Sequence, residues 1–214
     1  LVYGVKKIKM TYYGQAAIDK YLHENYFPNT KSGFFVECGA ADGLTESTCK
    51  FFEESMGWSG INIEPVPSSY EKLIINRPLS TNYNAALHNE HITKKFVHLQ
   101  SVKSPDFTFG LGRILKENEK FENNEEWNYI EFDVNCRKFS ELFKENREID
   151  LFVLDVEGSE IEAMEGILEI DKLFYPKIFC IEVTQINVEK LNSMLCKYYT
   201  ISERRNQDII YKKL

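Results

Sequence analysis

The stretch from Gly33 to Pro67 constrains the fold more than any other part of the chain. It opens with a short apolar run, Phe34 to Val36, which does not alternate with polar residues and is typical of a strand buried on both faces of a parallel sheet. A turn with glycines follows, then a segment with helical periodicity from about Ser47 to Met56, and then a second apolar run that ends at Glu64. This order predicts a strand–turn–helix–strand unit of an α/β fold, with the strand at Phe34 to Val36 in the middle of the sheet.

The turn after the first strand carries the residues of a ligand site. Gly39 and Gly43 allow the backbone to approach a ligand or to adopt a positive φ, which a Cβ atom would obstruct. Glu64 ends the second strand, 21 positions after Gly43. An acidic residue about 20 positions beyond such a turn hydrogen-bonds ribose hydroxyls in nucleoside-binding α/β folds. The spacing therefore predicts a nucleoside site.

The acidic residues of this turn discriminate between nucleosides. A dinucleotide fold has more glycine where this chain has Ala40 and Ala41, because a pyrophosphate must lie on the helix N-terminus. Glu37 and Asp42 would repel a pyrophosphate and favour a ligand with a ribose and a cationic amino group, as in S-adenosylmethionine. An ordinary turn with a solvated acid is the alternative, and the position of Glu64 argues against it.

Further signals lie in the segments FFVECGAADGLTESTCKFFEE, GWSGINIEP, NAAL (Asn84 to Leu87) and IDLFVLDVEGSEIEAMEGI (Ile149 to Ile167), with the lead-in Tyr13-Gly14-Gln15. Together these segments resemble the FkbM-type methyltransferases. The resemblance implies a Rossmann-like methyltransferase fold: a doubly wound, mostly parallel sheet with an antiparallel edge strand. It also implies an S-adenosylmethionine-dependent O-methyltransferase that acts on a hydroxyl of a sugar, glycan or secondary metabolite. One departure is Ala16, where relatives often carry an acid.

The expected cofactor contacts gather at the carboxyl ends of the strands, where open parallel sheets bind ligands. They are Glu37, Gly39, Ala40, Ala41, Asp42, Gly43, Glu64, Pro65, Asn84, Ala85 and Asp155. By analogy with the family, Asn84 and Ala85 form the wall for adenine, since small side chains there leave room for a flat base.

Methyl transfer to an oxygen is an in-line displacement, so the enzyme must align the acceptor and remove its proton. The candidates for the base are Asp155 first, then Glu157 and His88. Asp155, Glu157 and Glu182 are also compatible with a divalent metal, which prefers carboxylate oxygen. A helix-cap role for Asp155 or Glu157 is a third interpretation. The sequence leaves these roles open, and it contains no Cys/His cluster that predicts zinc.

Six carboxylates are expected around one crevice, where like charges raise one another's pKa. They are Glu37, Asp42, Glu64, Asp155, Glu157 and Glu182. We therefore expect something cationic beside them: the sulfonium and amino group of the cofactor, a divalent metal or basic side chains.

Residues 1–214 are interpreted as a single domain, since no internal repeat and no linker stands out. A lead-in of residues 1–32 contains a helix that ends at Pro28. Residues 80–88 predict a third strand. The alternating run from Lys94 to Leu99 predicts an antiparallel strand added beside it.

Residues 101–128 are the least regular part and are interpreted as a lid or acceptor loop, with a short helix starting at Arg113. Phe107, Phe109 and Arg113 are candidates for an acceptor pocket. The C-terminal tail predicts a hairpin around residues 204–208, with an antiparallel strand near Ile209 at the sheet edge.

Bulk composition fits one globular α/β domain: 214 residues, 43% hydrophobic and 28% charged. The net charge of −7 argues against a nucleic-acid partner. Five scattered cysteines without a CxxC pair favour reduced thiols, and no apolar run is long enough to span a membrane. With no signal-peptide pattern, these features favour a cytoplasmic protein. The chain begins at Leu1, which leaves open whether a segment precedes it.

Two other classes of function remain as alternatives. One is an NAD-dependent oxidoreductase on a Rossmann fold, against which the acids in the first turn argue. The other is a non-catalytic cofactor-binding or scaffold protein, which would need a lost pocket. The oligomeric state cannot be predicted from the sequence.

Overall fold

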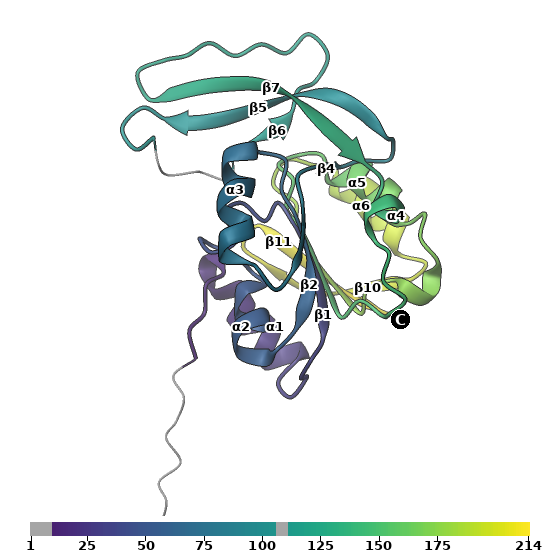
Figure 1. Ribbon diagram of the computed structural model, residues 1–214. Coiled ribbons are helices and arrows are strands. Elements are labelled where there is room, and N and C mark those ends of the chain that lie inside the picture. The colour runs from purple at the N-terminus through teal and green to yellow at the C-terminus, as the bar shows by residue number, and fades with distance from the viewer. Residues whose placement is uncertain (1–9, 106–110) are drawn as a thin grey trace, which may run out of the picture.

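The computed structural model describes residues 10–105 and 111–214, so the candidates Phe107 and Phe109 lie outside the described residues. Seven strands form a central sheet in the order β10-β11-β9-β8-β1-β2-β3 (Figure 1). The bounds of these strands are β1 (Phe34–Cys38), β2 (Ser59–Ile63), β3 (Thr81–Tyr83), β8 (Leu151–Leu154), β9 (Ile178–Glu182), β10 (Tyr199–Arg205) and β11 (Asp208–Lys213).

The pairing confirms a mostly parallel sheet. Neighbours from β9 to β3 are parallel, whereas β11 is antiparallel to β9 and β10 is antiparallel to β11. Two details of the prediction are wrong. The strand that contains Ile209, β11, is not the edge strand, because the hairpin folds β10 outside it. The central strand is β8, and β1 lies next to it.

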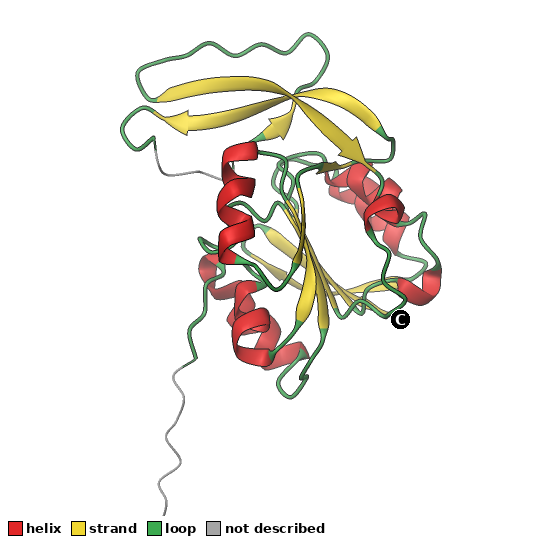
Figure 2. Cartoon of the chain, in the orientation of Figure 1, coloured by secondary structure: helices red, strands yellow, loops and turns green. Residues whose placement is uncertain are grey.

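Helices cover both faces of this sheet, as the red elements of Figure 2 show. Their bounds are η1 (Gln15–Ala17), α1 (Ile18–Tyr26), α2 (Lys50–Met56), α3 (Pro67–Asn76), α4 (Phe139–Leu142), α5 (Glu160–Ile167), η2 (Lys172–Phe174) and α6 (Val188–Leu195). Alternation along β1 separates two cores. Phe34 and Val36 pack with residues of α4, α5 and α6, whereas Phe35 packs with residues of α1 and α2.

A second sheet, which we call the cap sheet, lies across one end of the molecule (Figure 1). Its order is β4-β7-β5-β6. The bounds are β4 (Ala86–Leu87), β5 (Ile92–Ser101), β6 (Arg113–Ile114) and β7 (Trp127–Arg137). The long hairpin of β5 and β7 is its centre, with Phe96 opposite Phe132 in antiparallel register.

The cap sheet corrects three expectations. Residues 80–88 divide between β3 of the central sheet and β4 of the cap sheet. Lys94 to Leu99 pairs with β7 and not with the third strand. Arg113 begins strand β6 and not a helix, because the backbone of residues 113–114 finds ladder partners in Phe96 and Val97.

Within the described ranges, no helix combines the length and the apolar character that crossing a membrane requires. The five cysteines are free thiols; Cys38, Cys49, Cys136 and Cys180 are buried and Cys196 is exposed.

Candidate active site

The turn after β1 is held against the end of β8. Gly39 has a φ of +82°, and a Cβ atom added there would stand 1.8 Å from the backbone oxygen of Asp155. The N–H of Asp155 donates to the carbonyl of Cys38 at 3.1 Å. Gly39 is therefore required both for its backbone conformation and for the close approach of the two strand ends.

Glu64 follows β2 and faces the same turn. Its Oε2 accepts a hydrogen bond from the N–H of Ala41 at 2.9 Å, and its Oε1 accepts one from the N–H of Val66 at 2.8 Å. Burial raises the pKa of Glu64 to about 7, although the two backbone hydrogen bonds oppose this shift. The carboxyl group is thus fixed in orientation at the wall of a cavity.

That cavity has a volume of about 440 Å³ and lies between the central sheet and the cap sheet. Six of the predicted cofactor contacts line it: Gly39, Ala41, Glu64, Pro65, Ala85 and Asp155. Glu157 and Glu182 line it as well. The cap sheet contributes a mainly apolar wall with Phe96, Leu111 and Ile114. The cavity therefore combines an acidic part with an apolar part.

Four carboxylates gather at the acidic part. One oxygen each from Asp155, Glu157 and Glu182 lie within 4.8 Å of one another. Asp208 begins β11 and pairs in register with Glu182, which adds a fourth acid that sequence reasoning missed. Because β11 is antiparallel to its neighbour, its first residue lies at the same edge as the carboxyl ends of the parallel strands. In the sequence, the position of Asp208 directly after the hairpin turn was the signal that could have predicted its place at this edge.

The pKa values of these acids are raised. Packing of protein around the carboxyl group, followed by the charges of Glu182 and Glu157, raises the pKa of Asp155 well above its ordinary value, although part of the residue remains accessible to solvent. Burial and then Glu182 raise the pKa of Glu157 to about 7 and that of Asp208 to about 6. Among the residues that the structure describes, none of the four forms an ion pair with a basic side chain.

The loop between β8 and α5 holds Glu157 in place. Glu157 itself has a φ of +55°, and its Oε2 accepts a hydrogen bond from the Gln185 side chain at 2.6 Å. Glu160 is buried and accepts hydrogen bonds from the N–H groups of Val156 and Gly158 at 2.9 and 3.0 Å. Glu160 therefore stabilises the loop, whereas Glu157 turns toward the cavity.

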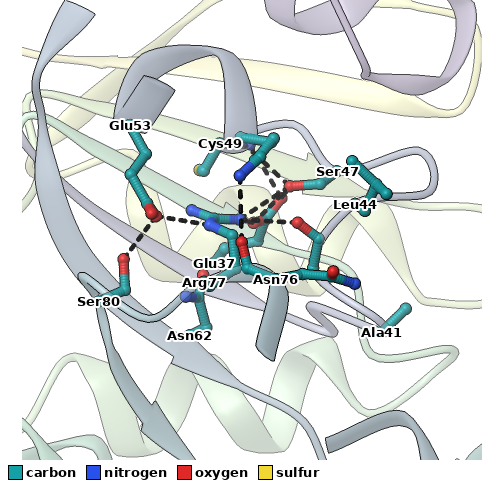
Figure 3. A network of polar contacts seen from close by, with 12 residues as sticks. Glu37, Ala41, Leu44, Ser47, Cys49, Glu53, Asn62, Asn76, Arg77 and Ser80 are labelled. Atoms are coloured by element: carbon teal, nitrogen blue, oxygen red, sulfur yellow. Dashed lines mark hydrogen bonds and ion pairs between the residues drawn. The ribbon is translucent and has the colours of Figure 1, made fainter. Parts of the chain in front are cut away.

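Glu37 is placed elsewhere. It lies on the same side of β1 as Phe35, beneath α2, and does not line the cavity. Its carboxylate accepts hydrogen bonds from Arg77 Nη1 at 3.0 Å and from the N–H of Cys49 at 3.0 Å (Figure 3). Arg77 is fully buried and also donates from Nε to Glu53 at 2.5 Å. Sequence reasoning missed Arg77, which supplies the cation that Glu37 needs.

The remaining predicted residues serve the turn or lie outside the cavity. Asp42 accepts hydrogen bonds from the N–H groups of Leu44 and Thr45, at 2.9 and 2.7 Å. The Asn84 side chain donates to the carbonyl of Glu64 at 2.9 Å. Ala40 and Gly43, like Asp42 and Asn84, are not among the described residues that line the cavity.

His88, the third base candidate, is buried, and its Nδ1 accepts from the N–H of Glu90 at 3.1 Å. It lines a second cavity of about 270 Å³. The two cavities share Ile114, Glu157, Ser159 and Gln185 in their walls, so they adjoin at Glu157. The structure does not bring His88 to the main cavity.

The residues present fit S-adenosylmethionine. The four carboxylates at one side of the cavity, which form no ion pair within the described residues, match a cationic head group. Glu64 faces the cavity with its carboxyl group fixed, as a ribose contact requires, and the apolar wall beside it matches a flat base.

The sheet order, with a cavity at the carboxyl ends of its parallel strands, is that of the Rossmann-like methyltransferase fold. The chain belongs to the FkbM methyltransferase family: the model described as "Methyltransferase FkbM domain" matches residues 37–205. It is similar in structure to a methyltransferase FkbM from Methylobacillus flagellatus KT, with 15% identity and a TM-score of 0.57, over 91% of this chain and 50% of that one. The chain thus spans about half the length of that structure.

A second solved structure with the same fold is a putative rRNA-methylase from Clostridium thermocellum, with 7% identity and a TM-score of 0.50, over 96% of this chain and 100% of that one. No curated protein matches the chain. At these identities the solved structures support the fold alone, and the family assignment rests on the match over residues 37–205.

Gly39→Ala should destabilise the chain and abolish ligand binding, because the new Cβ atom collides with the Asp155 backbone. Gly57→Ala is the matched control: Gly57 has a φ of +68° with nothing within 4 Å of the added atom. We expect Gly39→Ala to cost about 1–3 kcal/mol more in unfolding free energy than Gly57→Ala, the usual cost of overpacking. Urea unfolding measures both, and equal losses would show that the close approach is not tight.

Proposed function

We propose that this chain is an S-adenosylmethionine-dependent O-methyltransferase acting on a hydroxyl of a sugar, glycan or secondary metabolite. The observation that carries the proposal is one cavity in which the oriented Glu64 lies with Asp155, Glu157, Glu182 and Asp208, four acids without an ion-pair partner in the described part of the chain. Family membership supports the transferred group, and the cavity supports the cofactor.

Each part of the cofactor has candidate contacts. Glu64 would accept hydrogen bonds from the ribose hydroxyls, and the backbone at Gly39 would allow close approach of the chain. Pro65 and Ala85 would contact the base, and Asp155 would face the cationic end. When bound, the cofactor supplies an electrophilic methyl group.

Asp155 is the proposed base. It follows a buried strand, faces the cavity, and adjoins the second cavity through Glu157. A carboxyl group whose pKa is raised holds a removed proton more readily than an ordinary aspartate, which suits proton transfer from a hydroxyl. Glu157 is the second candidate on the same grounds.

The second cavity supports a polar acceptor. Its lining includes Lys94, Arg113, Lys116, Glu117 and Glu162, so both signs of charge and many hydrogen-bonding groups are available. A hydroxyl-rich molecule matches such a wall better than an apolar one does. Leu111 and Gly112 line the main cavity, Arg113 lines the second and Ile114 lines both, which supports the interpretation of residues 101–128 as an acceptor loop.

Asp155, Glu157 and Glu182 would also supply hard oxygen ligands to a divalent cation. Acidic groups at an open surface often lie this close without a metal, so a metal remains a secondary part of the proposal. An NAD-dependent oxidoreductase is disfavoured, because the acidic wall would repel a pyrophosphate. A scaffold protein without catalysis would not need the pocket to open onto Asp155.

Incubation with S-adenosylmethionine and a panel of glycans and hydroxylated metabolites, followed by mass spectrometry, tests the proposal. A mass gain of one methyl group on an acceptor oxygen is the expected result. Cofactor binding without methylation of any acceptor would favour the scaffold alternative.

Glu64→Ala should weaken the binding of S-adenosylhomocysteine by about 1–3 kcal/mol, the range for losing a charged hydrogen-bond partner. Because the raised pKa of about 7 keeps Glu64 protonated at lower pH, wild-type affinity should fall as the pH drops below about 7. Isothermal titration calorimetry over a pH series measures both effects.

Glu71→Ala is the matched control, since Glu71 lies on the same stretch of chain but is exposed. It should bind like the wild type. An unchanged affinity in Glu64→Ala, with the same pH dependence as the wild type, would remove Glu64 from the ribose site.

A further inference from the structure

The cap-sheet wall of the main cavity contains one polar side chain among its described residues, His98. Its neighbours in that wall are Ala86, Leu87, Phe96, Leu111, Gly112 and Ile114. His98 is 6% exposed, and its Nδ1 is buried without a hydrogen-bond partner in the described chain. A buried polar atom without a partner destabilises the protein, which points to a partner that a ligand supplies.

His98, on β5, lines the same cavity as Glu64. Phe96 and His98 stand two residues apart, on the same face of the strand, and both line the main cavity. Phe96 belongs to the same buried cluster as Val66, whose N–H donates to the Glu64 carboxylate. Lys94, two residues before Phe96, lines the second cavity instead. β5 therefore runs from the second cavity at Lys94 to the main cavity, which Glu64 also lines, at Phe96 and His98.

The chemistry of His98 selects a donor. Burial lowers the pKa of its imidazole, so the ring is neutral at physiological pH and retains one acceptor nitrogen. The acidic side chains that line the main cavity are carboxylates, which cannot donate when ionised. With its ribose on Glu64, a bound adenosine would present its base to this wall. Adenine has one donor on its edge, the exocyclic amino group.

We propose that His98 is a specificity-determining residue that accepts a hydrogen bond from the exocyclic amino group of the cofactor's adenine. This inference rests on the proposed function, because it needs an adenosine cofactor in the cavity. Under this inference, the cap sheet selects the base of the cofactor, a role separate from that of the acceptor loop.

The test compares two ligands by calorimetry: S-adenosylhomocysteine and its analogue with hydrogen in place of the amino group. Wild-type protein should bind the amino form about tenfold more tightly, the effect of one hydrogen bond. His98→Phe keeps a planar ring of similar size and should bind both ligands equally. A purely structural role would instead weaken both ligands by the same factor.

His91→Phe is the matched control, since His91 is exposed in the connection between β4 and β5, and it should keep the wild-type preference. His98→Leu serves as the second variant if His98→Phe does not fold. Retention of the tenfold preference in a folded His98 variant, or its absence in the wild type, overturns the inference while S-adenosylhomocysteine still binds. Failure of the wild type to bind either ligand would overturn the proposed function itself.

Discussion

Asp155→Asn should lower turnover by about 10²–10⁴-fold, the usual range for loss of a general base, with little change in cofactor affinity. Asparagine preserves the shape of the side chain but removes the negative charge that accepts the proton. Asp155 is held by the N–H bond to Cys38, which the substitution leaves intact. The variant therefore changes chemistry more than structure.

The dependence of turnover on pH tests the same role of Asp155 as a base. Loss of hydration and the charges of Glu182 and Glu157 raise the pKa of Asp155, so its basic form is lost at a higher pH than for an ordinary aspartate. Wild-type turnover should fall as the pH decreases through that raised pKa. In Asp155→Asn, the remaining turnover should no longer fall in this pH range through titration of residue 155.

Assays of the wild type and Asp155→Asn, with and without a chelator, separate the three interpretations of Asp155: a base, a metal ligand and a helix cap. A metal-ligand role predicts activity that vanishes with chelator and returns with magnesium or manganese. A helix-cap role predicts that Asp155→Asn remains active, because Asn caps about as well as Asp. Asp133→Asn, the same substitution on an exposed residue of β7, is the control. A fully active Asp155→Asn enzyme that ignores the chelator would remove Asp155 from the mechanism.

Arg77→Met should destabilise the protein by about 3–5 kcal/mol, because it leaves Glu37 and Glu53 buried without their cation. Arg77 connects the end of α3 to Glu37 of β1 and to Glu53 of α2 (Figure 3). Its guanidinium also lies 5.0 Å above the ring of Phe35. Chemical unfolding in urea measures the loss.

Lys95→Met is the control, because it removes a cation from an exposed ion pair with Asp133 and should change stability little. Combining Arg77→Met with Glu37→Gln and Glu53→Gln should recover part of the loss, since the uncompensated charges are then gone. An Arg77→Met protein as stable as the wild type would show that the network is not an electrostatic support.

The first strand–turn–helix–strand unit could be predicted from the sequence because its signals are local. The apolar run of β1, the glycine of positive φ and the acid at the end of β2 all lie within one stretch, and the structure has β1, α2 and β2 there. Helix α2 begins at Lys50 and not at Ser47, because Ser47 and the N–H of Cys49 are bound to Glu37.

The misplaced residues depended on partners distant in sequence. From the sequence, Glu37 resembles a ligand contact, because its buried partner Arg77 lies 40 positions later, at the C-terminal end of α3. The cap sheet was missed because a strand such as β5 alternates in the same way whichever sheet it joins. His98 was missed for the same reason, since the sequence does not show that β5 forms a wall of the main cavity.

Calorimetric titration of the wild-type protein with S-adenosylhomocysteine and, in parallel, with NADH tests the central claim most directly. The acidic wall and the oriented Glu64 predict that S-adenosylhomocysteine binds at one site per chain, whereas NADH does not bind, because the acids repel its pyrophosphate. Binding of NADH without binding of S-adenosylhomocysteine would contradict the account.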